Sequence, residues 1–313
     1  MKTNNNIPAY RFQGYTDAWE LRKLGEVAEI ITGTTPSTFD EENYGGKRLF
    51  VSPVDIQDNR YITETLTTLT EKGHLLGREL RPGATLFVSI GSTIGKVAQL
   101  KDFATSNQQI NAVISGDKID DDFIFTGLEK KSAQIKNLSS QQAVPIINKS
   151  TFSNIEFEFP TLPEQKAIGT FFSTLDQHIT LHQRKLDTLK EQKKTYLKLL
   201  FPAKGQTKPA LRFQGFEDDW KEVKLGEVLI KNSKRNKDLR IINVESVSNR
   251  LGFVKQTEQF EDYSVASSDL SNYYVISEKQ FAYNPSRINV GSIAYKKLGE
   301  ESSVVSPLYV SFS

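Results

Sequence analysis

A twenty-residue stretch occurs twice in this chain. Residues 8–27 read PAYRFQGYTDAWELRKLGEV, and residues 209–228 read PALRFQGFEDDWKEVKLGEV. Thirteen of the twenty positions are identical without a gap, at an offset of 201, and both tryptophans of the chain, Trp19 and Trp220, fall at matching positions. This period is far too long for a solenoid repeat. The pattern therefore predicts two tandem copies of one domain.

Beyond this opening, the two copies resemble one another only weakly. GKVA at 95–98 aligns with GSIA at 291–294, at an offset of 196. Because surface loops diverge faster than the elements that they connect, we expect one scaffold that carries two different surfaces. The same alignment places 303–313 opposite the region near 104–114. The second copy is therefore expected to be incomplete and to leave apolar surface uncovered.

The first copy has the pattern of a mixed α/β domain. Short runs rich in β-branched and aromatic residues alternate with glycine-containing turns, which is typical of strands joined by tight connections. We expect a helix around 120–137 and strands in the runs at 48–56, 84–90, 96–100, 110–114 and 155–159.

The segment 161–200 predicts one long helix. Thr161 and Glu164 have the spacing of a capping box, and Pro163 is tolerated in a first helical turn. Two series at sevenfold spacing interleave along the segment: Ile168, Leu175, His182, Leu189 and Tyr196 with Phe172, Ile179, Leu186, Lys193 and Leu200. This is the a/d pattern of a coiled coil, interrupted by one histidine and one lysine, and its seam would be roughly 50 Å long.

Such a seam needs a second helix, and no other segment of comparable length is available, so the mate is expected to come from another polypeptide. The alternative is an ordinary amphipathic helix that lies on a domain core. The narrowness of the apolar stripe over many turns favours the coiled coil.

Composition and charge limit the class of protein. Hydrophobic residues make up 37%, charged residues 25%, and the mean hydropathy is -0.44, as in water-soluble globular proteins. We found no apolar run long enough to span a bilayer, and we expect a cytoplasmic protein without a membrane partner. The chain has no cysteine, which excludes disulfides and thiolate metal sites. With a net charge of only +2, binding to nucleic acid would require positive charge focused on one face.

The stretch GSTIGKV at 91–97 resembles a phosphate-binding loop but lacks its pattern. Three residues rather than four separate Gly91 from Gly95, and Val97 stands where the loop needs serine or threonine. We expect a tight turn between two strands instead. Its backbone and the side chains of Ser92, Thr93 and Lys96 could still contact a DNA phosphate.

Two other motifs fail as catalytic signatures. HITLH places His178 and His182 four apart on a helix, but the glutamate of the zinc-protease motif is absent. NPSR at 284–287 lacks the second proline and the aromatic residue of adenine methyltransferases. We expect no catalytic residue, no metal and no cofactor.

Four features together resemble the specificity (S) subunit of type I restriction–modification systems. They are the W…KLGEV openings at 19–27 and 220–228, GSTIGKVA at 91–98, TSNQQINAVI at 105–114, and the segment at 159–201 in which LPEQ opens a heptad helix. The resemblance covers essentially the whole chain, apart from an apparent truncation of the second target-recognition domain.

The resemblance implies a fold and a division of labour. Each copy would be an α/β target-recognition domain followed by a long helix, and the two helices would pack antiparallel. Each domain would read half of a split DNA target. Methylation and cleavage would reside in separate modification and restriction subunits, with S-adenosylmethionine and ATP bound there. The implied domains are 1–160, the spacer helix 161–203, and a truncated second domain 204–313.

Candidate DNA contacts follow from side-chain chemistry. Arginine and lysine suit phosphates and guanine, while asparagine and glutamine suit adenine. The candidates in the first copy are Lys47, Arg48, Ser92, Thr93, Lys96, Asn107, Gln108 and Gln109; in the second copy they are Lys234 and Arg235, within the basic run 221–240, and Arg287. The alternative for each is an ordinary solvated loop residue.

Two other functions remain open at this point. Two chains could pair their unpartnered helices and act as a decoy or as a symmetric reader of a palindromic split site. The chain could also be an enzyme with a nucleotide or metal site, although no motif favours this.

Overall fold

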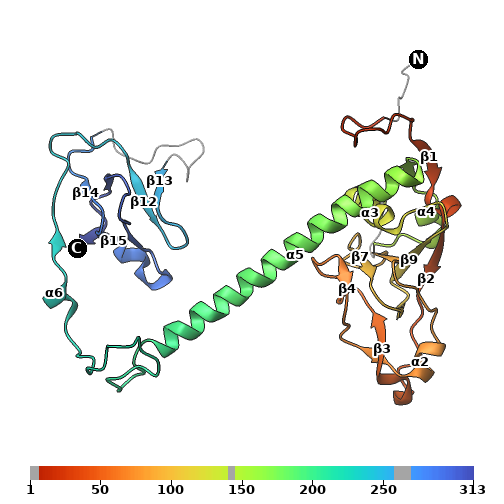
Figure 1. The fold of residues 1–313 in the computed structure, drawn as a ribbon, viewed down its shortest axis with the longest axis horizontal. Helices are drawn as coiled ribbons and strands as arrows, with labels where there is room; N and C mark the ends of the chain where they lie inside the picture. The colour runs from red at the N-terminus through yellow and green to blue at the C-terminus, as the bar shows by residue number, and fades with distance from the viewer. Residues whose placement is uncertain (1–6, 140–144, 257–268) are drawn as a thin grey trace. The chain divides into compact units, whose positions relative to one another are not determined.

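The structure is a computed structural model that describes residues 7–139, 145–256 and 269–313. The chain divides into two compact units, Met1–Thr195 and Tyr196–Ser313 (Figure 1). The described elements of the first unit are β1 Glu20–Lys23, α1 Leu24–Val27, β2 Ala28–Thr32, η1 Glu41–Asn43, β3 Tyr44–Val51, β4 Tyr61–Ile62, β5 Thr68–Leu69, α2 Glu71–Leu75, β6 Thr85–Val88, β7 Val97–Leu100, β8 Ala104–Ser106, β9 Ile110–Ser115, α3 Asp121–Asn137, α4 Lys149–Ser153, β10 Glu156–Phe159 and α5 Leu162–Leu199.

The first unit is built on a five-stranded sheet in the order β2-β9-β6-β7-β4. All four residues of β6 are buried, and they alternate between two cores as the period of a strand requires. Phe87 packs into a core shared with α1, α3, α4 and β10. Leu86 and Val88 pack into a second core with β3, β7 and β9. A three-stranded sheet, β5-β3-β8, and a two-stranded sheet, β1-β10, complete the unit.

The mixed α/β class and most of the predicted elements are confirmed. The predicted helix at 120–137 is α3, which Asp120 caps by accepting a hydrogen bond from the Phe123 N–H at 2.9 Å. The strand predicted at 48–56 is wrong in its second half, because β3 ends at Val51. The chain turns there, and the Asp55 carboxylate accepts from the Ser52 N–H at 2.8 Å.

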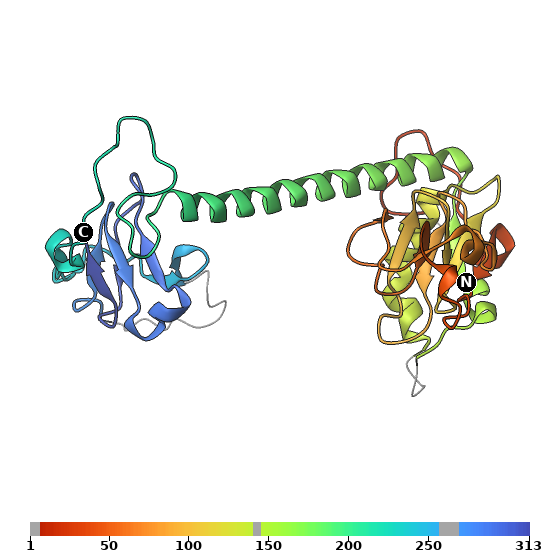
Figure 2. The same ribbon diagram turned by 90° about the horizontal axis from the view of Figure 1, so that it is seen from below.

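The long helix is confirmed as α5, one unbroken helix of 38 residues (Figures 1 and 2). Its first turns are anchored in the first unit, where Gly169 lies so close to Asp120 that a Cβ would collide with it. From 181 to 198 every side chain is exposed in this single chain. The predicted capping box is wrong, because the Glu164 carboxylate accepts from Arg11 instead, at 2.8 and 2.5 Å.

The second unit repeats four of the five strands of the main sheet of the first unit. Its described elements are α6 Leu225–Val228, β11 Lys231–Asn232, β12 Glu245–Ser248, β13 Gly252–Lys255, β14 Tyr274–Ile276, β15 Phe281–Tyr283, η2 Pro285–Val290, β16 Ile293–Tyr295, β17 Ser303–Val305 and β18 Val310–Phe312. The order β11-β18-β15-β16 matches β2-β9-β6-β7. The registers match as well, since Leu86 faces Ala98 and Ala112, while Ala282 faces Ala294 and Ser311. The predicted duplication of one scaffold is therefore visible in the strand pairing.

The second unit covers less of its apolar surface than the first. Leu24 is fully buried and its backbone N–H donates to the Ile155 carbonyl at 2.9 Å, whereas its counterpart Leu225 is 72% exposed. The main core of the second unit contains only five buried side chains among the described residues: Val247, Ile276, Ala282, Ala294 and Val305.

Candidate nucleic-acid interface

Three loops meet at one edge of the first unit. In the loop after β2, the Thr34 N–H donates to the carbonyl of Ser106, the last residue of β8, at 2.8 Å. The Thr35 hydroxyl donates to Gln108 Oε1 at 2.6 Å. The turn after β6 joins them, because the Ser89 N–H donates to the Gln109 carbonyl at 2.7 Å. We call this surface the polar edge; its residues are Thr34, Thr35, Ser92, Thr93, Asn107, Gln108 and Gln109.

Close backbone approach holds the polar edge together. A Cβ at Gly33 would collide with the carbonyl oxygens of Ser106 and Asn107, so only glycine lets these two loops meet. The hydroxyls of Thr34 and Ser106 are buried and have no hydrogen-bond partner among the described residues. Buried polar groups in native proteins usually have a partner, so these two hydroxyls are exceptions beside the polar edge.

The predicted tight turn at 91–95 is confirmed. Gly91 and Gly95 both have a φ of +97°, which glycine adopts without strain. The Gly95 N–H donates to the Val88 carbonyl at 2.9 Å and closes the hairpin between β6 and β7. Ser92 is exposed at its tip and Thr93 is half-buried.

The amide side chains of the polar edge are preorganised. Asn107 Nδ2 donates to Gln109 Oε1 at 3.0 Å, and Asn107 Oδ1 accepts from the Gln109 N–H at 3.1 Å. Gln108 is exposed, and the Thr35 hydroxyl holds its amide by the oxygen. Its NH₂ group has no hydrogen-bond acceptor among the described residues, so it faces solvent with both donors available.

The basic side chains among the candidates of the first unit do not join this hydrogen-bonded amide cluster. Arg48 is paired with Glu71 at 2.8 and 3.0 Å, and these hydrogen bonds lower the pKa of the Glu71 carboxyl. Lys96 Nζ donates to the Ile56 carbonyl at 3.0 Å. Lys47 is exposed on β3. Among the described residues none of these three side chains hydrogen-bonds to the polar edge, although the Lys96 backbone N–H donates to the Thr93 carbonyl at 3.2 Å.

The repeat places the candidates of the second unit at the equivalent edge. By the matched registers, Lys234 and Arg235 stand where Gly33 and Thr34 stand in the first unit, and Arg287 stands at the position of Gly91. Arg235 donates to the Asn272 carbonyl at 3.0 Å, and its guanidinium lies 5.2 Å from the Tyr274 ring centre. Arg287 is exposed on η2.

The two edges differ in the chemistry that they present. Asn107, Gln108 and Gln109 correspond to Ser306, Pro307 and Leu308, because β8 and β17 precede them in matching positions. The first edge is therefore rich in amides and hydroxyls, while the second is rich in cations.

Sequence analysis did not predict Thr34 and Thr35 as site residues. Their only signal is the polar stretch GTTPST directly after a strand.

Other classes of site find no support in the described residues. No group of three or more histidine, cysteine, aspartate or glutamate side chains is arranged to hold a metal ion there. Within the same residues, no helix combines the length and the apolar character needed to cross a membrane.

Comparison with known proteins identifies the family. The family model for the type I restriction modification DNA specificity domain matches residues 16–191, more than half of the chain. The chain therefore belongs to this family.

Individual relatives agree with this assignment. The chain is 24% identical to the type I restriction enzyme MjaIX specificity subunit of Methanocaldococcus jannaschii, over 90% of this chain and 66% of that protein. It is 30% identical to the HindI specificity subunit of Haemophilus influenzae, over 51% of this chain and 37% of that protein. The chain thus spans two thirds or less of the length of these relatives.

A solved structure shows the same fold. The type I restriction–modification system S subunit from M. genitalium superimposes with a TM-score of 0.58 at 14% identity, covering 99% of this chain and 75% of that chain.

Proposed function

We propose that this chain is a non-catalytic DNA-specificity subunit whose first unit reads one half of a split target. The observation that carries this proposal is the polar edge, where a preorganised amide cluster is presented on a scaffold that the second unit repeats with different side chains. Membership of the DNA specificity family supports it. We propose the domains as 1–160, 161–203 and 204–313, each recognition domain serving one half-site.

The proposed contacts follow from the chemistry of each side chain. Gln108 and its amide neighbours would read base edges, because an amide matches adenine with two hydrogen bonds. Ser92, Thr93, Lys47 and Lys96 would contact phosphates, which position the protein without reading sequence. Arg48 would contact a phosphate only if its ion pair with Glu71 were broken. In the second unit, Lys234, Arg235 and Arg287 would contact phosphates or guanine.

The chemistry of methylation and cleavage would belong to other subunits. We propose that a modification subunit and a restriction subunit assemble with this chain and bring their own S-adenosylmethionine and ATP. This chain would then need no cofactor. As a DNA-binding subunit of such a complex, it would work in the cytoplasm.

Replacing Gln108 by alanine is expected to weaken binding to the preferred DNA by about 10- to 100-fold, since a bidentate amide–base pair contributes about 1–3 kcal/mol of discrimination. Binding to unrelated DNA should change little, because phosphate contacts dominate there. Fluorescence anisotropy at fixed salt measures both affinities. Gln192→Ala, on the exposed part of α5, is the matched control and should leave both unchanged.

Equal loss of affinity for all DNA sequences in the Gln108→Ala variant would contradict base reading at this position. Unchanged affinity for the preferred DNA would contradict the placement of the interface at the polar edge.

A second candidate function rests on α5. The seam side chains Phe172, Leu175, Ile179, Leu186, Leu189 and Tyr196 are 40–66% exposed in the single chain, while Ile168 packs on the first unit and Leu200 is half-buried. A long apolar stripe of this kind marks an interaction face. We propose that α5 pairs with another helix, and that two copies of this chain can pair in this way, either as a decoy or as a symmetric reader of a palindromic split site.

A further inference from the structure

Arg78 places a guanidinium beside the polar edge. Its Nη1 donates to the carbonyl of Thr32, the last residue of β2, at 2.7 Å. Thr34, where the polar edge begins, follows two residues later, which is at most about 7 Å along the chain. Arg78 is exposed. Sequence analysis did not predict it as a site residue, because its contact with the end of β2 depends on tertiary structure.

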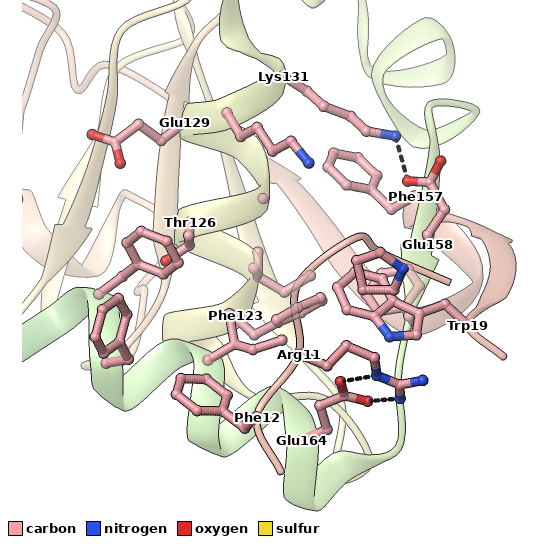
Figure 3. A pocket seen from close by; sticks show the side chains of 18 of the residues that line it. Arg11, Phe12, Trp19, Phe123, Thr126, Glu129, Lys131, Phe157, Glu158 and Glu164 are labelled. Carbon is pink, nitrogen blue, oxygen red and sulfur yellow. Dashed lines mark hydrogen bonds and ion pairs between the residues drawn. The ribbon is translucent and has the colours of Figure 1, made fainter. Parts of the chain in front are cut away.

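Two other arginines of the first unit show what a guanidinium binds with its Nε–H and Nη2–H. Arg11 holds the two carboxylate oxygens of Glu164 with these donors, at 2.8 and 2.5 Å (Figure 3). Arg48 holds Glu71 in the same way, at 2.8 and 3.0 Å. Arg78 uses only Nη1, so among the described residues its Nε–H and Nη2–H have no acceptor. They form a pair of parallel donors that is free for a ligand.

The carboxylate next to Arg78 in sequence is engaged elsewhere. Glu79 Oε2 lies 2.8 Å from Nε2 of the buried His74. No ion pair joins Arg78 to a carboxylate in the part of the chain that the structure describes. An arginine without an acidic partner keeps its positive charge available for an anion or for a group with two acceptors.

The position of Arg78 has an equivalent in the second unit. The bridge between Leu80 and β8 matches the pair between Ile276 and β17. Arg78 and Tyr274 each precede these residues by two and therefore occupy equivalent positions. Tyr274 in turn forms a bridge with Arg235, which is the counterpart of Thr34.

One arginine therefore occupies this pair of positions in each unit. The pair is Thr34 and Arg78 in the first unit, and Arg235 and Tyr274 in the second. Arg235 Nη1 donates to the Asn272 carbonyl at 3.0 Å, and its guanidinium lies 5.2 Å from the Tyr274 ring centre. Both arginines are held by a backbone carbonyl at the same edge of the scaffold, although they come from different strands.

We propose that Arg78 reads a guanine in the half-site of the first unit. Guanine presents two acceptors, O6 and N7, on its major-groove edge, and the two parallel donors of an arginine match them. The Thr32 carbonyl fixes the guanidinium. A fixed, planar donor pair suits a base edge, whereas a phosphate needs only a cation. The inference rests on the proposed function, and it adds a guanine contact to the adenine contacts proposed for Gln108 and its neighbours.

Selection of bound sequences from random double-stranded DNA tests this contact. The full chain, assembled with the modification subunit proposed above, is compared with the same complex carrying Arg78→Ala. The variant should lose the preference for guanine at one position in one half of the split motif and retain the other specified positions. Arg184→Ala is the matched control, because it removes the same charge from an exposed position of α5, and it should leave the motif unchanged.

Binding measurements then assign the contact to atoms of the base. By fluorescence anisotropy, Arg78→Ala should bind the preferred DNA about 10- to 100-fold more weakly than the natural chain. 7-Deazaguanine at the identified position lacks the N7 acceptor and still pairs with cytosine. It should weaken binding of the natural complex about tenfold, while the Arg78→Ala complex should bind both DNAs equally.

Three results would count against the inference in distinguishable ways. Equal loss of affinity for all sequences, with the salt dependence of binding reduced by about one phosphate contact, would replace guanine reading by a phosphate contact. An unchanged motif and affinity in Arg78→Ala would overturn any DNA contact of Arg78 and leave the proposed function standing. Enrichment of no motif by the natural complex would contradict the proposed function and this inference together.

Discussion

Replacing Arg60 by alanine is expected to lower the free energy of unfolding of the first unit by about 3 kcal/mol, because it leaves two carboxylates unpaired beside a buried site. Chemical denaturation followed by circular dichroism measures this loss. For a unit of this size the melting temperature should fall by roughly 6–12 °C. The far-ultraviolet spectrum at low temperature should stay native.

The structure around Arg60 explains the size of this effect. Its side chain is only 2% exposed, and its two terminal nitrogens bind Asp122 at 2.7 Å and Asp176 at 2.9 Å. Arg60 Nε donates to Gln99 at 3.0 Å, and the guanidinium lies 4.2 Å from the Phe125 ring centre. The two carboxylates belong to α3 and α5, so one side chain ties the long helix to the domain.

Arg48 provides the matched control within the same unit. It also makes a two-nitrogen contact with a carboxylate, but the pair with Glu71 is exposed. Exposed ion pairs contribute about 0–1 kcal/mol. Arg48→Ala should therefore change stability by less than about 1 kcal/mol. Equal losses in the two variants would show that burial does not decide the strength of the Arg60 contacts.

Replacing Leu186 by aspartate is expected to weaken self-association at least about 100-fold, because a seam residue would bring an unpaired charge into the apolar contact between two helices. Leu186 lies in the exposed part of α5 and contacts no domain core, so the folded monomer should be unaffected. Sedimentation equilibrium over a range of concentrations measures the dimer dissociation constant.

Thr188→Asp is the control for this change, since it adds the same charge to the same helix outside the seam. Its dissociation constant should remain within about threefold of the natural chain, as expected for a peripheral position. A chain that is monomeric at every concentration, or a Leu186→Asp variant that dimerises like the natural chain, would contradict pairing through α5.

Local and repeated patterns made the main elements predictable. The heptad spacing from Ile168 onward identified α5 because a helix depends on near neighbours alone. The duplicated twenty residues identified the shared scaffold, which the matching strand registers of β6 and β15 confirm. The turn at Gly91 was predicted because a glycine between two strand-like runs usually marks a turn.

The contacts that long-range packing creates were not predictable. Arg60, Asp122 and Asp176 lie far apart in sequence, and no spacing rule joins them. The contact between Arg11 and Glu164 was not predictable either. The Glu164 carboxylate accepts from Arg11 and does not form the predicted capping box. Gln108 was selected from the sequence for its chemistry, but its partner Thr35 lies on a different loop and was missed. Arg48 looked free in the sequence, whereas tertiary structure pairs it with Glu71.

Selection of bound sequences from random double-stranded DNA tests the central claim most directly. The full chain, assembled with the modification subunit proposed above, should enrich a split motif with two short specified halves separated by a fixed number of unspecified base pairs. A variant with Asn107, Gln108 and Gln109 replaced by alanine should lose the preference in one half and retain the other. Enrichment of no motif by the natural complex, or an identical split motif from the variant, would contradict the reading of DNA by the polar edge.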